Sequence, residues 1–570
     1  MSTRSVPPII CSFFGSTIDI RDFGNVLQSE HFSIDEYDEE YGTYFNEERY
    51  FLENFGDFDH DKKFLFEQGK NDLEFFSLHF FPHLCKKSFS AMHKEFFTAY
   101  NANIGQRGIL NATAAPRANA KTTIITTIAS IHGILYKYEK YILILQAKFD
   151  LAKDIVKSIR EELESNKEII RVFGPQVTDF WNMDDIITQF RCRVRAASPD
   201  TKLRGLLWDG NRVTKICLDD IESDKTTQTE EQREKLEKKY TQVIRQLGTL
   251  GHTNIEFVGT ILHDNSLLSK LLRNPGYNRR FYKSVIKFCD EESIPYWQNW
   301  RGIYINLYDD NAKENAREYF EQNKEIMLKG AEVLWPEEES YYNLMCLRVI
   351  DGEIAFQQEK QNIPARDNNL VFDMDNAGYF SVDNFLLKRN DGIDVHFMDL
   401  TSFVAYLDPA LGETKDRPDY STLLIGAKDQ RGYKYVLDCY MTNKDNMDTQ
   451  IIYMANMLFK WGITKMYFEG NGFQSQIKPA IMQAISRKAL EEKTTWGVTV
   501  LPIINTRSKI RRILSLQPHI ANRWIYFNQD LPEEFFRQIE VFIPTPDADK
   551  DDGPDALEGL TSAMETEVMI

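Results

Sequence analysis

The sequence predicts an α/β protein of two domains joined by a helical region. From about residue 90, short apolar strands alternate with amphipathic helices, which is typical of a parallel sheet covered by helices. Between about 310 and 395 this alternation breaks. Beyond 395, three strands separated by turn residues precede a helix, another strand and further helices, which indicates a second sheet with antiparallel strands. A chain of 570 residues is long enough for such domains.

Composition excludes several classes of protein. The net charge of −18 argues against a protein that coats nucleic acid nonspecifically, although a basic channel in an enzyme remains compatible with it. Seven cysteines without a C-x-x-C pair argue against zinc ribbons and disulfide frameworks. Because no signal peptide and no apolar run of ~20 residues is present, we expect a soluble intracellular protein that does not bind membranes.

Residues 1–90 form an acidic and aromatic N-terminal extension, which we expect to pack on the domain that follows. The aromatic runs 50–52 and 75–81 are either partner-binding patches or the core of a helical cap. We favour the core, because aromatic clusters at helical spacing are more often buried.

A nine-residue loop is the first candidate site. It lies between a predicted buried strand at 108–113 and a helix that begins at 124, and it comprises Ala115, Pro116, Arg117, Ala118, Asn119, Ala120, Lys121, Thr122 and Thr123. In this context backbone N–H groups and the helix N-terminus bind phosphate, Lys121 reaches the outer phosphates, and the Thr122 hydroxyl contacts Mg²⁺. The loop therefore predicts an ATP site; the alternative is a buried strand–helix turn with an exposed lysine.

The glycines that such loops usually contain are replaced here. Ala115 and Ala120 occupy both glycine positions of the pattern G-x-x-x-x-G-K-[ST]. An alanine adds only a methyl group, so we expect the loop to keep its conformation provided that neither position requires a positive φ.

An acidic strand end completes the predicted ATP site. The strand that begins at 215 runs directly into Asp219, Asp220 and Glu222. In ATPases a carboxylate at this place holds the Mg²⁺ shell, and an adjacent acid orients the attacking water. We assign the metal role to Asp219 and leave the water-orienting role open between Asp220 and Glu222.

Three further residues are candidates for the same site. The predicted strand 255–262 carries Thr260 near its end, where a hydroxyl either senses the γ-phosphate or simply packs in the core. Arg117 and Arg204 could stabilise the charge of the transition state, one in its own subunit and the other from a neighbouring subunit.

The second domain carries acids at topologically related points. Asp408 and Glu469 end two predicted strands, and Asp552 lies at the start of a terminal helix. An RNase H-like nuclease needs three or four carboxylates that converge on two divalent ions, which activate water and stabilise the leaving oxygen. The pattern predicts this class of enzyme.

Taken together, these motifs resemble those of the large subunit of a tailed-phage terminase, the motor and nuclease that packages DNA into proheads. The resemblance covers about residues 90–565. It is carried by the sequences 115–122, Leu218–Asp219–Asp220–Ile221–Glu222, 258–263, Leu407–Asp408–Pro409 and 551–557. It implies a P-loop ATPase domain of the ASCE/RecA-like type, followed by an RNase H-like nuclease domain. Ala118 is the departure from the family pattern, which favours glycine there.

The resemblance also implies ligand sets. Lys121, Thr122 and Asp219 would bind ATP and Mg²⁺, and Asp408, Glu469 and Asp552 would bind two Mg²⁺ or Mn²⁺ ions. Asp419 falls where an accessory acid is often found. Asp555 competes with Asp552, and this choice stays open. Lys509 and Arg512 resemble a basic pair near the nuclease site, or are solvated.

We divide the chain into an N-terminal extension (1–90), an ATPase domain (91–310), a helical linker or lid (311–395) and a nuclease domain (396–570). The resemblance implies that the protein binds double-stranded DNA, the portal of the prohead and a small terminase subunit. It implies a homo-oligomeric ring, a pentamer, when active and allows a monomer in solution. The expected location is the host cytoplasm, with transient docking on the portal.

Two alternatives from other classes remain open. The chain could be a helicase-like or transposition ATPase with an RNase H-like domain, or a virion or portal-docking protein whose motifs have decayed. Packaging strategy and cleavage specificity are not encoded in any motif that we can interpret.

Overall fold

The computed structural model describes residues 60–227, 229–364, 371–409, 420–469, 478–503, 508–544 and 551–566, with backbone alone at 224, 225 and 469. Within 1–59 it describes only the backbone of two antiparallel hairpins: β1 (Ile10–Phe13) with β2 (Ser16–Asp19), and β3 (Glu36–Asp38) with β4 (Thr43–Phe45). The predicted aromatic run 50–52 lies outside the described residues. Among the described residues, no helix is long and apolar enough to cross a membrane.

The first large sheet has seven strands in the order β11-β5-β10-β9-β6-β8-β7. Its strands are β5 (Leu110–Ala114), β6 (Tyr141–Leu145), β7 (Asp185–Ile187), β8 (Arg193–Ala197), β9 (Lys215–Asp219), β10 (Asn254–Gly259) and β11 (Asn278–Phe281). All pairs are parallel except β7 with β8. Because β10 lies between the phosphate-loop strand β5 and the acidic strand β9, the predicted ASCE/RecA-like arrangement is confirmed.

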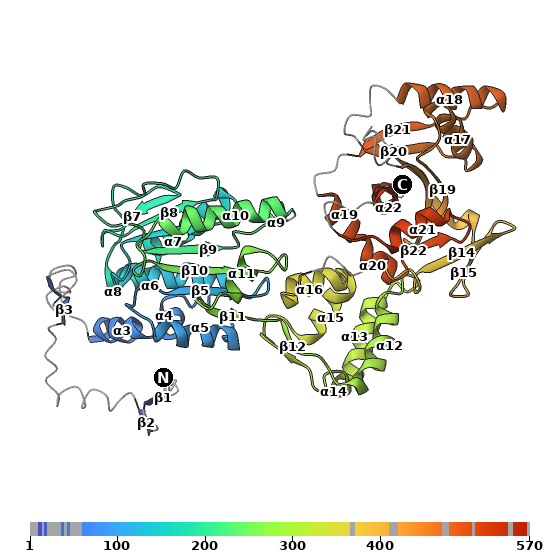
Figure 1. The fold of residues 1–570 in the computed structure, drawn as a ribbon. Helices are drawn as coiled ribbons and strands as arrows, with labels where there is room; N and C mark the ends of the chain where they lie inside the picture. The colour runs from blue at the N-terminus through green and yellow to red at the C-terminus, as the bar shows by residue number, and fades with distance from the viewer. Residues whose placement is uncertain are drawn as a thin grey trace.

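Helices cover both faces of this sheet (Figure 1). One face carries α3 (His60–Asn71), α4 (Leu73–Phe80), α5 (Ala91–Asn101), η2 (Thr122–Ile128), α6 (Ala129–Leu135), α7 (Phe149–Ser165) and α8 (Lys167–Phe173). The other face packs against α10 (Glu230–Gln242), η3 (Ile244–Gln246) and α11 (Leu267–Arg273), with α9 (Asp224–Thr227) just before α10.

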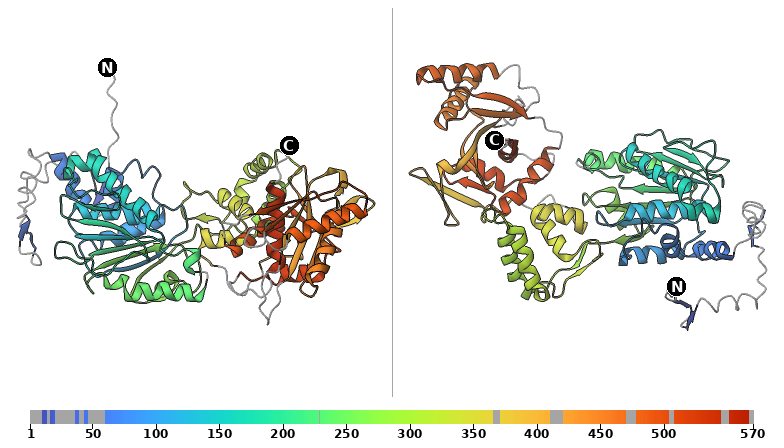
Figure 2. Two further views of the ribbon diagram at one scale, coloured as in Figure 1. Left: turned by 90° about the horizontal axis from the view of Figure 1, so that it is seen from above. Right: turned by 180° about the vertical axis from the view of Figure 1, so that it is seen from behind.

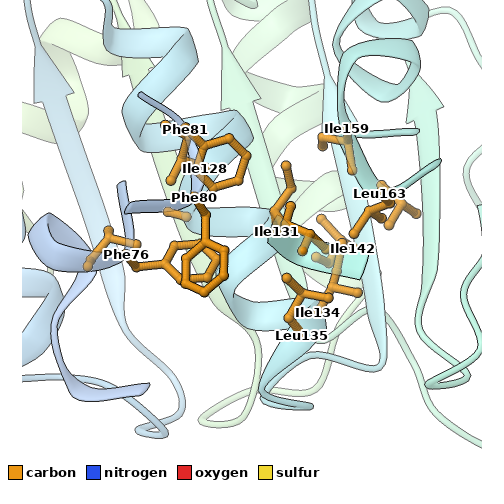
Figure 3. Packing of buried hydrophobic residues seen from close by; sticks show 14 of the residues in the cluster. Phe76, Phe80, Phe81, Ile128, Ile131, Ile134, Leu135, Ile142, Ile159 and Leu163 are labelled. Atoms are coloured by element: carbon orange, nitrogen blue, oxygen red, sulfur yellow. The ribbon is translucent and has the colours of Figure 1, made fainter. Parts of the chain in front are cut away.

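The aromatic run at 75–81 is core, as we favoured. Phe76, Phe80 and Phe81 are almost fully buried. Figure 3 shows Phe76 and Phe80 beside Ile128 and Ile131 of the helix that follows the phosphate loop. Within the described residues, those from 60 to 90 therefore contribute to the core that packs against the first sheet.

A helical linker follows β11 and lies between the two large sheets (Figures 1 and 2). Its elements are β12 (Val285–Lys287), η4 (Glu291–Ser293), α12 (Ile294–Tyr304), α13 (Ala312–Gln322), α14 (Lys324–Met327), β13 (Glu332–Val333), α15 (Tyr341–Ile350) and α16 (Glu353–Gln361). It has a core of its own that includes Trp300, Phe320 and Tyr342.

The second large sheet has nine strands in the order β16-β15-β14-β22-β19-β18-β17-β20-β21. Its strands are β14 (Gly378–Asp383), β15 (Leu386–Arg389), β16 (Asp394–His396), β17 (Leu400–Asp408), β18 (Ser421–Asp429), β19 (Lys434–Thr442), β20 (Lys465–Glu469), β21 (Thr499–Ile503) and β22 (Ile525–Asn528). Strands β17, β18 and β19 are antiparallel neighbours, whereas β20 lies parallel to β17 and β21 parallel to β20. This order confirms the predicted RNase H-like fold.

Helices again cover both faces of the second sheet. Its helices are α17 (Met447–Lys460) and α18 (Lys478–Glu491) on one face, and α19 (Lys509–Leu514), α20 (Leu516–Ala521), α21 (Glu533–Glu540) and α22 (Asp552–Thr566) on the other, with the short η5 (Phe397–Asp399) before β17. The predicted terminal acidic helix is α22.

The predicted boundaries around the linker are wrong at both ends. The first large sheet ends with β11 at Phe281, so the linker begins well before residue 311. The second large sheet already begins at β14, before 396, because an unpredicted hairpin extends its edge. The linker is bound to the second domain: Arg301 donates to the Ala521 carbonyl (2.9 Å), and Asn522 donates to the Val349 carbonyl (2.9 Å).

Candidate functional site

The predicted phosphate loop connects β5 to η2, at the carboxyl edge of the first sheet. Ala118 and Ala120 adopt φ values of +68° and +49°. We expected the loop to keep its conformation provided that neither glycine position requires a positive φ; this condition is not met at Ala120. Ala118, where the family favours glycine, also has a positive φ. Both residues are held in the left-handed region, which costs an L-residue on the order of 1–2 kcal/mol.

Lys121 lies at the centre of the loop site. Its ammonium donates to the Thr260 hydroxyl (2.9 Å) and forms an ion pair with Asp220 (3.1 Å), while its side chain is almost buried. Thr260 follows β10 directly, and Asp220 follows β9, so the sheet order brings both to the phosphate loop. A cation and a hydroxyl therefore meet where an outer phosphate would bind.

Asp219, the last residue of β9 and the neighbour of Asp220 in the chain, is fully buried. Its carboxylate accepts hydrogen bonds from the Thr122 hydroxyl (3.0 Å) and the Thr126 hydroxyl (2.6 Å). Residues 122–128 form a π-helix, whose wider turn places these two threonines on one face. Burial, and next the charge of Asp220, raise the pKa of Asp219 to about 6.

The two acids left open for the attacking water have different surroundings. Asp220 has φ +45° and a side chain 39% exposed beside Lys121. Glu222, in contrast, accepts hydrogen bonds from the backbone N–H groups of Leu267 (2.6 Å) and Leu268 (3.0 Å) at the start of α11. Burial raises the pKa of Glu222 although these bonds lower it. The candidate role of Glu222 is corrected accordingly: its carboxylate caps a helix.

Neither arginine candidate contacts the Lys121 group. Arg117 forms an ion pair with Glu359 of α16 (2.8 Å). Arg204 is exposed on the loop after β8, which is four strand positions from β5 in the sheet order. The strand that precedes Arg204 is thus not a neighbour of the phosphate-loop strand.

A cavity of about 460 Å³ adjoins the phosphate loop, and our sequence analysis missed it. Its lining includes Phe89, Trp335, Lys86, Ala118 and Thr123. Trp335 comes from the linker and donates to the Ser88 carbonyl (2.7 Å). The basic pair at 86–87, in an otherwise acidic segment, could have indicated this cavity from the sequence. No sequence pattern could have indicated Trp335, because its position depends on how the linker folds back.

His93 supports the loop from below this cavity. Its Nδ1 accepts from the Ser90 N–H (3.1 Å), so its Nε2 carries the hydrogen that is donated to the Asn119 carbonyl (2.9 Å). Burial lowers the pKa of His93, although the bond to Asn119 opposes this. The neutral imidazole thus fixes the phosphate loop to α5.

In the second domain, backbone register brings two of the predicted acids together. Leu407 pairs with Phe468 in parallel strands β17 and β20, so Asp408 and Glu469 end neighbouring strands at the same edge. The side chain of Glu469 and the whole of Asp419 lie outside the described residues. Asp552 accepts a hydrogen bond from the Tyr420 N–H (3.1 Å) at the start of β18.

Lys509 and Arg512 are not merely solvated. Lys509 forms ion pairs with Asp551 (2.9 Å) and Asp555 (3.4 Å), and Arg512 pairs with Asp555 (3.0 Å). Burial lowers the pKa of Lys509, but Asp555, Asp551 and Asp408 outweigh it and raise this pKa above its usual range. The negative charge of Asp408 thus acts on Lys509 together with Asp551 and Asp555. Asp555, which is held by two cations, is less available as a metal ligand than we expected.

Both domains carry oxygen-bearing side chains that suit divalent ions. Hydroxyl and carboxylate oxygens are the ligands that Mg²⁺ and Mn²⁺ prefer, and the Thr122–Asp219 pair supplies both. In the nuclease domain, no three His, Cys, Asp or Glu side chains among the described residues converge closely enough to hold an ion. With Asp408 and Glu469 on adjacent strand ends, the donor chemistry fits a divalent ion there.

Comparisons with known proteins gave structural matches only. No family model matches the chain. No curated protein matches it significantly. A large terminase from a thermophilic bacteriophage, solved in complex with ADP, is 10% identical, covers 82% of this chain and 98% of its own, and has a TM-score of 0.41. The large terminase nuclease of the thermophilic phage G20c is 15% identical and covers 34% of this chain and 98% of its own, with a TM-score of 0.23. The human cytomegalovirus terminase nuclease domain is 13% identical and covers 29% of this chain and 82% of its own, with a TM-score of 0.22.

Proposed function

We propose that this chain is the large subunit of a tailed-phage terminase, which uses ATP to drive double-stranded DNA into proheads and cuts concatemeric DNA with a metal-dependent nuclease. The observation that carries the proposal is the presence, in one chain, of a Lys121–Asp220–Thr260 group at a phosphate loop and of two acids, Asp408 and Glu469, at the ends of neighbouring strands in an RNase H-like sheet.

In the ATPase domain, each residue has a proposed role. Lys121 binds the outer phosphates, and Thr122 with Asp219 holds Mg²⁺, which neutralises phosphate charge. Asp220, partly exposed beside Lys121, orients the attacking water. The aromatic side chains of Phe89 and Trp335 bind the base of the nucleotide in a cavity of a size usual for such ligands.

In the nuclease domain, Asp408 and Glu469 hold the divalent ions together with Asp552. We retain Asp419 as an accessory acid, and Asp555 as the alternative to Asp552. When bound, the ions would supply a nucleophilic water at neutral pH and would stabilise the leaving oxygen. Lys509 pairs with Asp551 and Asp555. When the ions offset part of the negative charge of these carboxylates, Lys509 would bind a DNA phosphate.

The finer parts of the proposal concern assembly. Arg204 is exposed and follows a strand that is not adjacent to β5. We infer that, as a transition-state arginine, it would act on a neighbouring subunit in a homo-oligomeric ring. The pentameric state, portal docking in the host cytoplasm and a small-subunit partner follow from the family resemblance alone. A helicase-like or transposition ATPase shares the fold, and only a packaging assay separates these enzymes.

The first test uses the purified full chain. We expect Mg²⁺-dependent ATP hydrolysis and Mn²⁺-dependent nicking of plasmid DNA. Lys121→Ala should lower hydrolysis by orders of magnitude and leave nicking intact, whereas Asp408→Asn should abolish nicking and leave hydrolysis intact. Each variant thereby controls for the folding of the other. Wild-type protein without either activity would favour the decayed virion protein, and ATP-driven DNA uptake by portal-bearing proheads would select the terminase.

A further inference from the structure

We propose that Asn362, at the end of linker helix α16, is a positioning residue for ATP hydrolysis; this inference rests on the proposed ATPase activity. Asn362 is 1% exposed and has φ +52°, a left-handed conformation that asparagine adopts more readily than most residues. It belongs to the linker, not to the sheet that carries the phosphate loop.

Both ends of the Asn362 amide are bonded to the ATPase domain. Its Oδ1 accepts a hydrogen bond from the Ile261 N–H (3.1 Å), and its Nδ2 donates to the Tyr282 carbonyl (2.8 Å). Ile261 and Tyr282 lie just beyond the ends of β10 and β11, respectively. These strands flank β5 on its two sides, so the amide spans the point at which the phosphate loop leaves the sheet.

The elements that Asn362 joins are those that hold the reacting groups. Thr260, adjacent to Ile261, accepts the hydrogen bond from Lys121. Around β5, the Ala115 N–H donates to the Gly259 carbonyl (3.0 Å), and the Tyr282 N–H donates to the Ala114 carbonyl (2.9 Å). Because Asn362 fixes the chain directly after Thr260, it sets the distance between the Thr260 hydroxyl and the Lys121 ammonium.

The same helix end also holds the phosphate loop by its backbone. The Arg117 N–H donates to the Glu359 carbonyl (3.2 Å), and the Lys360 ammonium donates to the Arg117 carbonyl (3.2 Å). Residues 359–362 thus contact both the loop and the strand end that face the outer phosphates. The linker completes the ATP site, and Asn362 is its most buried polar contact there.

Substitutions at 362 separate the two bonds. Leucine is of similar size but makes neither bond. Aspartate can still accept from Ile261 but cannot donate to Tyr282 when ionised. Asn522 offers a matched control: it is also a buried amide that caps a helix end, and it bridges Arg301 and Val349 at the linker–nuclease contact, away from the ATP site.

The experiment measures steady-state ATP hydrolysis and melting temperature of the full chain as wild type, Asn362→Leu, Asn362→Asp and Asn522→Leu. A misplaced Thr260 should lower kcat of Asn362→Leu by about tenfold or more, since small misplacements near the reacting groups have large effects. The KM for ATP should change much less, because the loop still binds phosphate. Asn362→Asp should fall between wild type and Asn362→Leu.

Asn522→Leu also loses two buried hydrogen bonds, but it should lose less thermal stability than Asn362→Leu, because Asn522 has φ −92° and leucine meets no left-handed strain there. It should keep the wild-type kcat. If Asn362→Leu and Asn522→Leu have the same kcat, Asn362 is only structural and the inference is overturned while the ATPase function stands. If wild type hydrolyses no ATP, the proposed function fails and this inference with it. Should Asn362→Leu not fold, Asn362→Asp decides in its place: a wild-type kcat overturns the inference, and a reduced kcat with little change in KM supports it.

Discussion

Asp219→Asn should stabilise the nucleotide-free protein at neutral pH while it abolishes Mg²⁺–ATP binding. Asp219 is fully buried, and burial followed by the charge of Asp220 raises its pKa from 3.8 to about 6. A carboxyl whose pKa is raised by folding contributes stability below its unfolded pKa. That contribution is lost as the pH rises through the folded pKa, here between about 4 and 6.

The magnitude follows from the shift. A difference of about 2 pKa units between 3.8 and about 6 corresponds to about 3 kcal/mol at pH 7, at 1.36 kcal/mol per unit. Asparagine is neutral at every pH and can still bond both threonine hydroxyls, so the variant avoids this penalty. For a domain of this size, ~3 kcal/mol corresponds to roughly 6–12 °C in melting temperature.

Melting scans of wild type and Asp219→Asn from pH 4 to 8 without metal test this reasoning. The difference should grow from near zero at pH 4 to its full value above pH 7. Asp179→Asn, at an exposed loop carboxylate, controls for the loss of one charge. Adding Mg²⁺–ATP should raise the melting temperature of wild type only. A variant that is less stable at pH 8, or a difference independent of pH, would refute the argument.

Two further predictions concern the same loop and strand end. Asp220→Asn should bind ATP without turnover, whereas Glu222→Gln should keep turnover. Glu222→Gln should lose ~1–3 kcal/mol of stability, because glutamine has one acceptor oxygen for the two backbone N–H groups of Leu267 and Leu268 and leaves one of them unsatisfied. ATP binding, hydrolysis and urea unfolding of both variants check this, and equal turnover in the two would contradict it. Ala118→Gly should relieve ~1–2 kcal/mol of left-handed strain. The greater conformational entropy of glycine in the unfolded chain offsets roughly 0.5–1 kcal/mol of this gain, so the melting temperature should rise slightly. A lower melting temperature would show that packing of the Ala118 methyl group stabilises the protein by more than the strain costs.

The sequence could predict the acids because strand ends in one sheet share an edge. Asp220 and Thr260 were placed at strand ends from hydrophobic runs alone, and the sheet order brought both to Lys121 without any further information. Asp408 and Glu469 followed from the same rule in the second sheet. Position along a strand is a local property, and the pattern of apolar residues reports it.

The parts that failed depend on distant segments. The role of Glu222 is decided by the start of α11, 45 residues later in the chain. Trp335 reaches the cavity beside the phosphate loop only because the linker folds back over the loop. The glycine positions of the loop pattern were a signal for Ala118 and Ala120, but alanine itself does not report φ, so the positive φ of these residues is seen only in the structure.

At both candidate sites a lysine offsets the repulsion between neighbouring carboxylates. Carboxylates that must gather to hold divalent ions repel one another when no ion is bound. In each domain a lysine pairs with an acid next in sequence to a proposed metal ligand: Lys121 pairs with Asp220, beside Asp219, and Lys509 pairs with Asp551, beside Asp552, and with Asp555. Under the proposed function, a bound ion would share the neutralisation of this negative charge with the ammonium. We therefore expect each lysine to be more available to a phosphate, of ATP in one domain and of DNA in the other, so that metal binding and phosphate binding reinforce each other at both sites.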